Sequence, residues 1–141
     1  MFVSSRKAIN SYAKVGLETG VDSANPHRLI AMLLDGAIFS LGKAAHALKE
    51  KRIDEKCKAI STSVDIISSG LQASLNLEAG GEIADHLNAL YDYMCTRLMY
   101  ANLHNNLAAI EEVSSLLGEI KGGWEEIAND PAVASHNRLP S

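Results

Sequence analysis

The feature that most constrains the fold of this chain is the placement of its prolines, which stand only at positions 26, 131 and 140. Proline removes a backbone donor and its ring clashes with the preceding turn, so helix interiors exclude it. The long stretch between Pro26 and Pro131 is therefore free to be helical throughout. Leu, Ala, Glu and Lys are common and aromatic residues make up only 5% of the chain, a balance that favours helices over sheets.

Apolar residues recur at three- and four-residue intervals in five segments, which predicts five helices. We expect a short N-terminal helix and four longer ones, over residues 5–17, 25–49, 54–74, 82–104 and 106–128. Asn25 can cap the second helix and Pro26 suits its first position, because N–H groups in a first turn have no helical partner. A turn over 76–81, closed by two glycines, precedes the fourth helix, and Pro131 follows the end of the fifth.

Four long helices joined by short connections predict an all-α fold: an antiparallel four-helix bundle with an additional short N-terminal helix packed across it. The third helix should face inward through a heptad-like seam of Cys57, Ile60, Val64, Ile67, Leu71 and Leu75. The fourth should do so through Ile83, Leu87, Leu90, Met94 and Leu98. We expect one domain over 1–128, capped by its N-terminal helix, and a disordered tail over 129–141.

Charge and hydropathy argue against several classes of protein. The net charge is −4 and no concentrated basic face is evident, whereas nucleic-acid binders need one to neutralise phosphates. Residues 1–7 lack the apolar stretch of a signal peptide. The longest apolar run, over 29–34, is far shorter than the ~20 residues of a membrane span. We therefore expect a cytosolic protein that neither binds nucleic acid nor inserts into a membrane.

Residue types used in catalysis are present without the patterns that catalysis needs. No histidine follows a glutamate by three positions, as di-iron bundles require, and Cys57 and Cys95 lack Cys-x-x-Cys partners. Residues 36–43 depart from a P-loop because the glycine spacing is one residue too long. We expect no enzyme activity, cofactor or metal. The two cysteines are expected to be buried free thiols, with a disulfide or a reactive thiol as the alternative.

The chain has more apolar residues than a bundle core needs. On a helical wheel, Met32, Gly36 and Phe39 lie nearly opposite the main apolar stripe of their helix, where a simple bundle helix is charged. The third helix adds many small residues, and the fourth adds tyrosines and Met99 beyond its seam. This pattern indicates a groove for an amphipathic partner helix. Alternatively, the N-terminal helix or dimer contacts cover these positions. The two interpretations are compatible if the N-terminal helix covers the groove until a partner displaces it.

Several stretches together resemble one known family. Residues 25–38 read NPHRLIAMLLDGAI and residues 80–94 read GGEIADHLNALYDYM, followed by Glu112-Val113, Leu116-Leu117 and Trp124 near the end. With the tyrosine region SYAKV at 11–15, these stretches cover nearly all of residues 10–127. They are similar to the FliS family of flagellin-specific export chaperones.

The resemblance implies a cytoplasmic chaperone that binds the disordered C-terminal segment of flagellin, prevents premature polymerisation and keeps flagellin competent for flagellar type III secretion. It also implies that the segment around Tyr12 packs over part of the same surface and must move, so we predict Ile9 and Tyr12 as a movable cover. The predicted groove residues are Met32, Phe39, Ile66, Leu71, Tyr91 and Met94. The export gate and other flagellar regulators are candidate further partners.

Two other classes of function remain open at this point. The first is a structural or regulatory helical bundle that self-associates through its exposed apolar stripe; a stable dimer that buries Met32 and Phe39 would support it. The second and weaker one is a metal-dependent bundle enzyme, which metal analysis of the purified protein tests.

Overall fold

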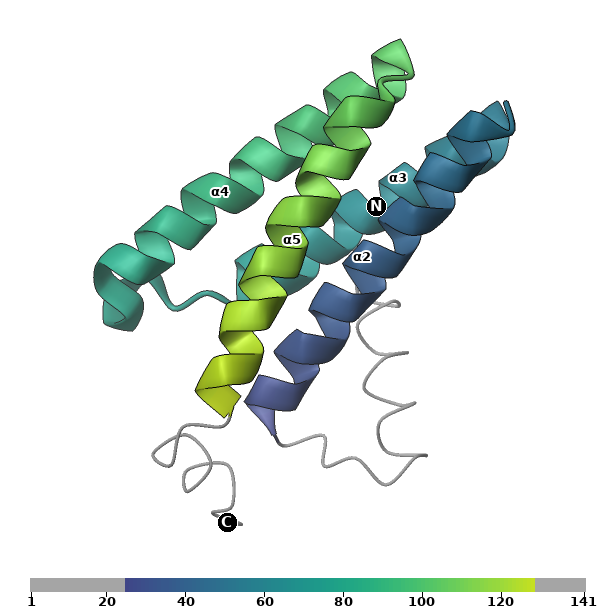
Figure 1. The fold of residues 1–141 in the computed structure, drawn as a ribbon. Coiled ribbons are helices and arrows are strands. Elements are labelled where there is room, and N and C mark those ends of the chain that lie inside the picture. The colour runs from purple at the N-terminus through teal and green to yellow at the C-terminus, as the bar shows by residue number, and fades with distance from the viewer. Residues whose placement is uncertain (1–24, 129–141) are drawn as a thin grey trace.

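The computed structural model describes residues 25–128, and the regular structure within this range is entirely helical. Four long helical segments run back and forth beside one another (Figure 1). They are α2 (Pro26–Lys49), α3 (Ile53–Asp65) with its extension, α4 (Leu77–His104) and α5 (Leu107–Ala128). The predicted all-α bundle is thereby confirmed. The predicted N-terminal helix over 5–17 and the predicted tail over 129–141 lie outside the described residues.

Helix α2 begins where the sequence predicts. The Asn25 side chain accepts a hydrogen bond from the backbone N–H of Arg28 at 3.2 Å, and Pro26 occupies the first helical position. The helix ends in a tight corner, where Lys51 has a φ of 61° and the Arg52 N–H donates to the carbonyl of Ala47 at 2.8 Å. This corner turns the chain directly into α3.

The third helical segment is less regular than its sequence predicts. After α3 the chain widens into a π-helical turn, Ile66–Leu71, and then tightens into a 3₁₀ turn, Gln72–Ser74. The N–H of Gln72 reaches back to the carbonyl of Ile67, five residues earlier. Small residues favour such a departure, because a serine hydroxyl competes for helix carbonyls: the hydroxyl of Ser74 donates to the carbonyl of Gly70 at 2.5 Å.

Helix α4 begins earlier than predicted and is broken near its start. The Asn76 side chain caps it by accepting from the Ala79 N–H at 3.0 Å. Gly81 then leaves the helical region with φ 58° and ψ −139°, a conformation open to glycine, so one turn precedes the predicted start at 82. The prediction that Ile83 faces inward is wrong, because the buried stripe passes through the adjacent Ala84 and leaves Ile83 73% exposed.

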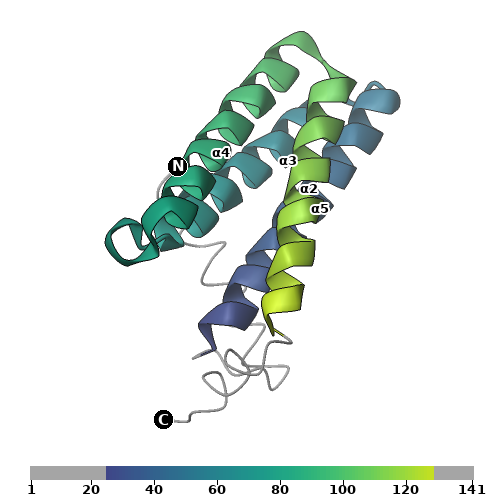
Figure 2. The same cartoon turned by 60° about the vertical axis from the view of Figure 1, so that its left-hand side comes forward.

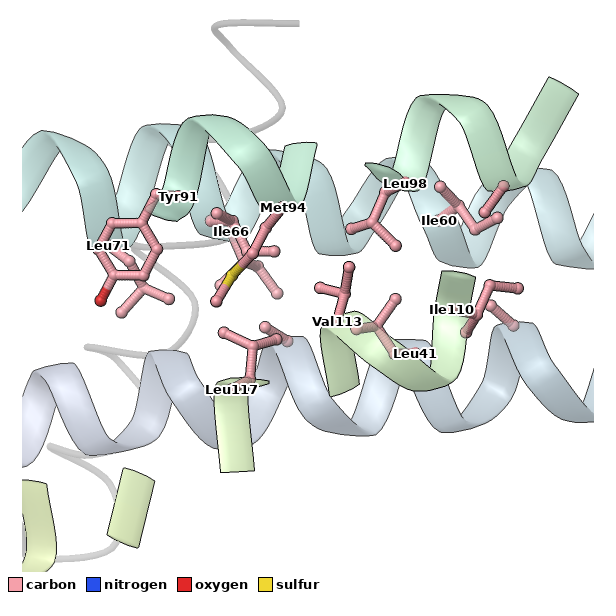
Figure 3. Close-up of a cluster of buried hydrophobic side chains, with 14 of the residues drawn as sticks. Leu41, Ile60, Ile66, Leu71, Tyr91, Met94, Leu98, Ile110, Val113 and Leu117 are labelled. Carbon is pink, nitrogen blue, oxygen red and sulfur yellow. The ribbon is translucent and has the colours of Figure 1, made fainter. Parts of the chain in front are cut away.

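All four helices contribute to one core. Figure 3 shows its central side chains meeting between the helices, among them Leu41 from α2, Ile60 from α3, Leu98 from α4 and Val113 from α5. Each of these four is at most 2% exposed. Burial of one such aliphatic side chain contributes about 1.5–3 kcal/mol, so this shared core is the main source of stability.

An aromatic clamp joins the first turn of α2 to the last turns of α5. The rings of His27 and Trp124 stack with centroids 4.4 Å apart and planes 7° from parallel. The indole N–H of Trp124 donates to the carbonyl of His27, and the His27 Nε2–H donates to the carbonyl of Trp124, both at 2.8 Å. The two helix ends lie side by side in both Figure 1 and Figure 2. The clamp therefore closes the end of the bundle at which the described residues begin and finish.

Of the described helices, only α2 is long and apolar enough to cross a membrane by length and composition, with a mean hydropathy of 1.3 in its most apolar window. The same helix supplies Leu33, Leu34 and Leu41 to the core, each at most 1% exposed. A helix that packs against neighbours on more than one side needs this much apolar surface. Packing within the bundle thus accounts for its composition.

Two substitutions on α2 test the direction in which the helix faces. Leu41→Ala should lower the free energy of unfolding by about 3 kcal/mol, because it leaves a cavity in the core. Phe39→Ala, two residues away, should change it by no more than about 0.5 kcal/mol, because that ring is already exposed. Urea unfolding followed by far-UV circular dichroism measures both, and equal losses would contradict the orientation of α2.

Candidate functional site

The two α2 residues predicted to contact a partner lie on or near the surface. Phe39 is 68% exposed, and Met32, about two turns earlier on the same helix, is half-buried. Gly36, predicted to open a depression between them, is itself buried. The predicted cover residues Ile9 and Tyr12 lie outside the described residues.

The other four predicted groove residues are part of the core. Ile66, Leu71, Tyr91 and Met94 are each at most 3% exposed, and Figure 3 shows them pointing inward among the other core side chains. A partner could reach them only by displacing a bundle helix. The expectation that they line an open groove is corrected accordingly. An apolar stripe has the same sequence period whether it faces the core or a partner, so periodicity did not distinguish core residues from groove residues.

A first groove runs between α2 and α3, next to Phe39. It has a volume of about 410 Å³ and is lined by Ser40, Lys43, Glu55, Lys58, Ala59 and Thr62. The ammonium of Lys43 lies 5.7 Å from the centre of the Phe39 ring, within reach of a cation–π interaction. Two cations and one carboxylate thus stand around a small-residue floor, beside an exposed aromatic ring.

A second groove, which the sequence did not predict, lies between α3 and α4. It has a volume of about 440 Å³ and is lined by Ile53, Lys56, Cys57, Met99, Asn102, Leu103 and Asn105. Met99 and Leu103 are 67% and 78% exposed and stand one turn apart on α4. The sequence signal for this groove is the i, i+4 pair of Met99 and Leu103 beyond the core seam. Only Met99 of this pair was identified from the sequence.

Lys56 links the two helices that form the second groove. Its ammonium donates to the backbone carbonyl and to the side-chain oxygen of Asn102, both at 2.8 Å. The residue is only 1% exposed. Its side chain is thus buried, and its ammonium connects α3 to α4 through Asn102.

A polar cluster joins α4 to α5 at the surface. Glu112 accepts from the Tyr93 hydroxyl and, at 2.9 Å, from Nε of Arg97. The hydrogen bond from Tyr93, then that from Arg97 and its charge, hold the pKa of Glu112 below its usual range against the opposing effect of burial. The same hydrogen bond, with burial, raises the pKa of Tyr93. These contacts fix the relative position of the two helices and need no further chemical role.

The two cysteines are free and half-buried, in agreement with the expectation of unpaired thiols. Burial, followed by the nearby charges of Asp92 and Asp65, raises the pKa of Cys95 to about 11. Cys57 lines the second groove. Within residues 25–128, no three or more His, Cys, Asp or Glu side chains are grouped so that they could hold a metal ion.

Comparison with known proteins agrees with the resemblance seen in the sequence. Residues 8–131 match the family described as flagellar protein FliS. The chain belongs to the FliS family. It is 48% identical over 120 residues to the flagellar secretion chaperone FliS of Salmonella typhimurium, covering 85% of this chain and 89% of that one.

Other FliS proteins are similar over nearly the same length. The flagellar secretion chaperone FliSB of Pseudomonas aeruginosa is 42% identical over 87% of this chain and 97% of its own. The flagellar secretion chaperone FliS of Bacillus subtilis is 26% identical over 77% of this chain and 80% of its own. The whole bundle, and not one motif, is thus shared with FliS proteins.

The raised pKa of Cys95 predicts a slow thiol. In the full-length Cys57→Ser variant Cys95 is the only cysteine, and a pKa raised from 9.0 to about 11 lowers its thiolate fraction at pH 8. Its reaction with a disulfide reagent should therefore be at least about tenfold slower in the folded chain than in the same chain unfolded in urea, since the greater nucleophilicity of a thiolate of higher pKa offsets only part of the loss. Absorbance of the released thiol measures both rates. Equal rates would show that the Cys95 environment is not the one described.

Proposed function

We propose that this chain binds the C-terminal segment of flagellin in the cytosol, prevents its premature polymerisation and keeps it competent for flagellar type III secretion. Membership of the FliS family supports the proposal, since relatives of this chain are named flagellar secretion chaperones. Sequence periodicity supports it independently, because it indicates an outward apolar face on the helix 26–49.

The observation that carries the proposal is Phe39. Its ring is 68% exposed on a helix whose opposite side supplies Leu34 and Leu41 to the core. A partner helix that covers this ring and the half-buried Met32 would remove apolar surface from water and gain about 2 kcal/mol from the ring alone. The groove between α2 and α3 runs alongside and offers room for partner side chains.

The charges around this groove suit a helical cargo segment. Lys43 and Lys58 line it with Glu55 as the one acidic lining residue. Cations stabilise the carbonyl end of a helix and attract carboxylates, so a partner helix could end or carry acidic residues here. A segment that is disordered before binding must also lose conformational entropy as it folds on the chaperone. This entropy cost offsets part of the favourable contact energy, so even an extensive interface can release its cargo at the export machinery.

The predicted cover formed by Ile9 and Tyr12 remains part of this proposal. If the segment that contains them lies over the Phe39 surface in the free protein, flagellin must displace it. Removing the apolar side chains at those two positions would then strengthen the binding of cargo, because less contact has to be broken.

Titration of the full-length protein with a peptide of the flagellin C-terminal segment tests the function. We expect one-to-one binding with a negative heat-capacity change and a gain in far-UV helical signal beyond the sum of the components. Phe39→Asp should weaken binding at least about tenfold, because it places a charge in an apolar contact. Ile83→Asp is the matched control: Ile83 is 73% exposed on α4, and its change should leave affinity unaltered.

Two results would contradict the proposal. One is the absence of binding by the native protein. The other is a stable dimer in sedimentation that Phe39→Asp converts to monomer without any effect on flagellin binding. That second result would favour the self-associating bundle as the role of this surface.

A further inference from the structure

The second half of α5 contains three glycines that its surroundings do not require. Gly118, Gly122 and Gly123 are exposed, and a Cβ atom added at any of them would meet nothing within 4 Å. None of them has a positive φ, since among the described glycines only Gly81 does. Glycine is the poorest helix former after proline. The three positions therefore weaken this part of α5 without a gain in packing or in backbone geometry.

The same part of α5 contributes little to the core. The first half of the helix supplies fully buried side chains such as Val113 and Leu117, whereas no side chain of residues 118–127 is buried to that extent. Ile120 and Trp124 are partly buried and pack against the core. A segment with few buried apolar contacts opens at a lower free energy than the whole protein. The firmly packed part of α5 thus ends at Leu117.

Polar contacts hold the second half of α5 to α2. The ammonium of Lys121 lies 2.6 Å from a carboxylate oxygen of Asp35, and Trp124 forms the aromatic clamp with His27. In the described part of the chain, every hydrogen bond and ion pair between this half and another helix is one of these. The ion pair is partly exposed, and such pairs contribute little to stability. The clamp is therefore the main polar attachment.

We propose that residues 118–127 form a latch, which unfolds and refolds as one unit on α2 while the remainder of the bundle stays folded. The glycines lower the free energy of opening, and the clamp between His27 and Trp124 keeps the latch closed. Because the clamp lies near the last turn of α5, its loss leaves the glycine-containing turns without a strong contact, and they open together.

Opening of the latch changes which surfaces are exposed to solvent. It uncovers the side of α2 that bears His27 and Asp35, and it exposes the apolar side chains of Ile120 and Trp124. These surfaces are accessible in the open form alone. A partner that binds them shifts the equilibrium toward the open form by its difference in affinity for the two forms.

Amide hydrogen exchange of the full-length protein, followed residue by residue by NMR, tests the latch. After correction for intrinsic rates, the amides of residues 119–127 should exchange with one common rate. That rate should be at least about tenfold higher than in the first half of α5, because the latch opens without the rest of the bundle. Urea well below the concentration that unfolds the bundle should accelerate these amides equally, because opening of a unit exposes surface.

Substitutions connect this exchange to the glycines and the clamp. The triple variant Gly118→Ala, Gly122→Ala, Gly123→Ala should slow exchange of the latch amides about 100-fold, since each change favours the helix roughly fivefold. Trp124→Ala should accelerate it at least about tenfold and leave the first half of α5 unaltered. Gly42→Ala on α2 is the matched control. Gly42 is also exposed with open space around it, so its change should not slow the latch amides.

Any one of three results would overturn the latch. Exchange of its amides at the same rate as the first half of α5 would show that α5 opens only with the whole bundle. Rates that rise steadily toward residue 127 and do not respond to urea would show fraying of an ordinary helix end. Equal slowing by the triple variant and by Gly42→Ala would reflect global stability alone. None of these results depends on flagellin binding, so the proposed function is tested separately.

Discussion

Packing around α2 is the constraint on which the rest of the bundle depends. This helix contacts α3, the π-helical turn and α5, so three parts of the chain are arranged around it. Its buried stripe includes Leu33, Leu34, Ala37 and Leu41, which are essentially inaccessible to solvent. Because the stripe alone fixes these contacts, the residues on the outer side of α2 are released from packing. Phe39, which is 68% exposed, can then vary with little effect on stability.

The bundle was readable from the sequence because its signals are local and agree with one another. Asn25 and Pro26 mark the start of α2, and Ile60, Ile67 and Leu71 of the predicted third seam lie in the core. Irregularities escaped the same reasoning. The π-helical turn at Ile66–Leu71 and the break at Gly81 arise from small residues whose effect on the backbone depends on their neighbours. A helical wheel assumes an unbroken helix, so it takes no account of a change in helical phase at such residues. For this reason Ile83 was predicted to face the core in place of the adjacent Ala84.

The sequence predicted correctly that Phe39 on α2 lies outside the core, whereas its prediction of exposed residues on the other helices was less accurate. On α2 the core stripe is complete without Phe39, so a second apolar face stood out. On α4 the residues Tyr91 and Met94 fit the core and a groove equally well by spacing, and only the packed structure shows that they are buried. Lys56 could not be found from the pattern, since a lysine near a helix start is ordinarily a solvated charge. Its burial depends on α4, whose residue Asn102 accepts two hydrogen bonds from the Lys56 ammonium.

The clamp between His27 and Trp124 gives the bundle an internal optical probe. Trp124 is the only tryptophan in the chain, and its indole is stacked on an imidazole and hydrogen-bonded to the backbone of α2. Its emission therefore depends on whether the ends of α2 and α5 are joined. Separation of those ends changes both the stacking and the hydration of the ring. Opening at this end of the bundle can thus be followed in real time without a label and apart from unfolding of the core.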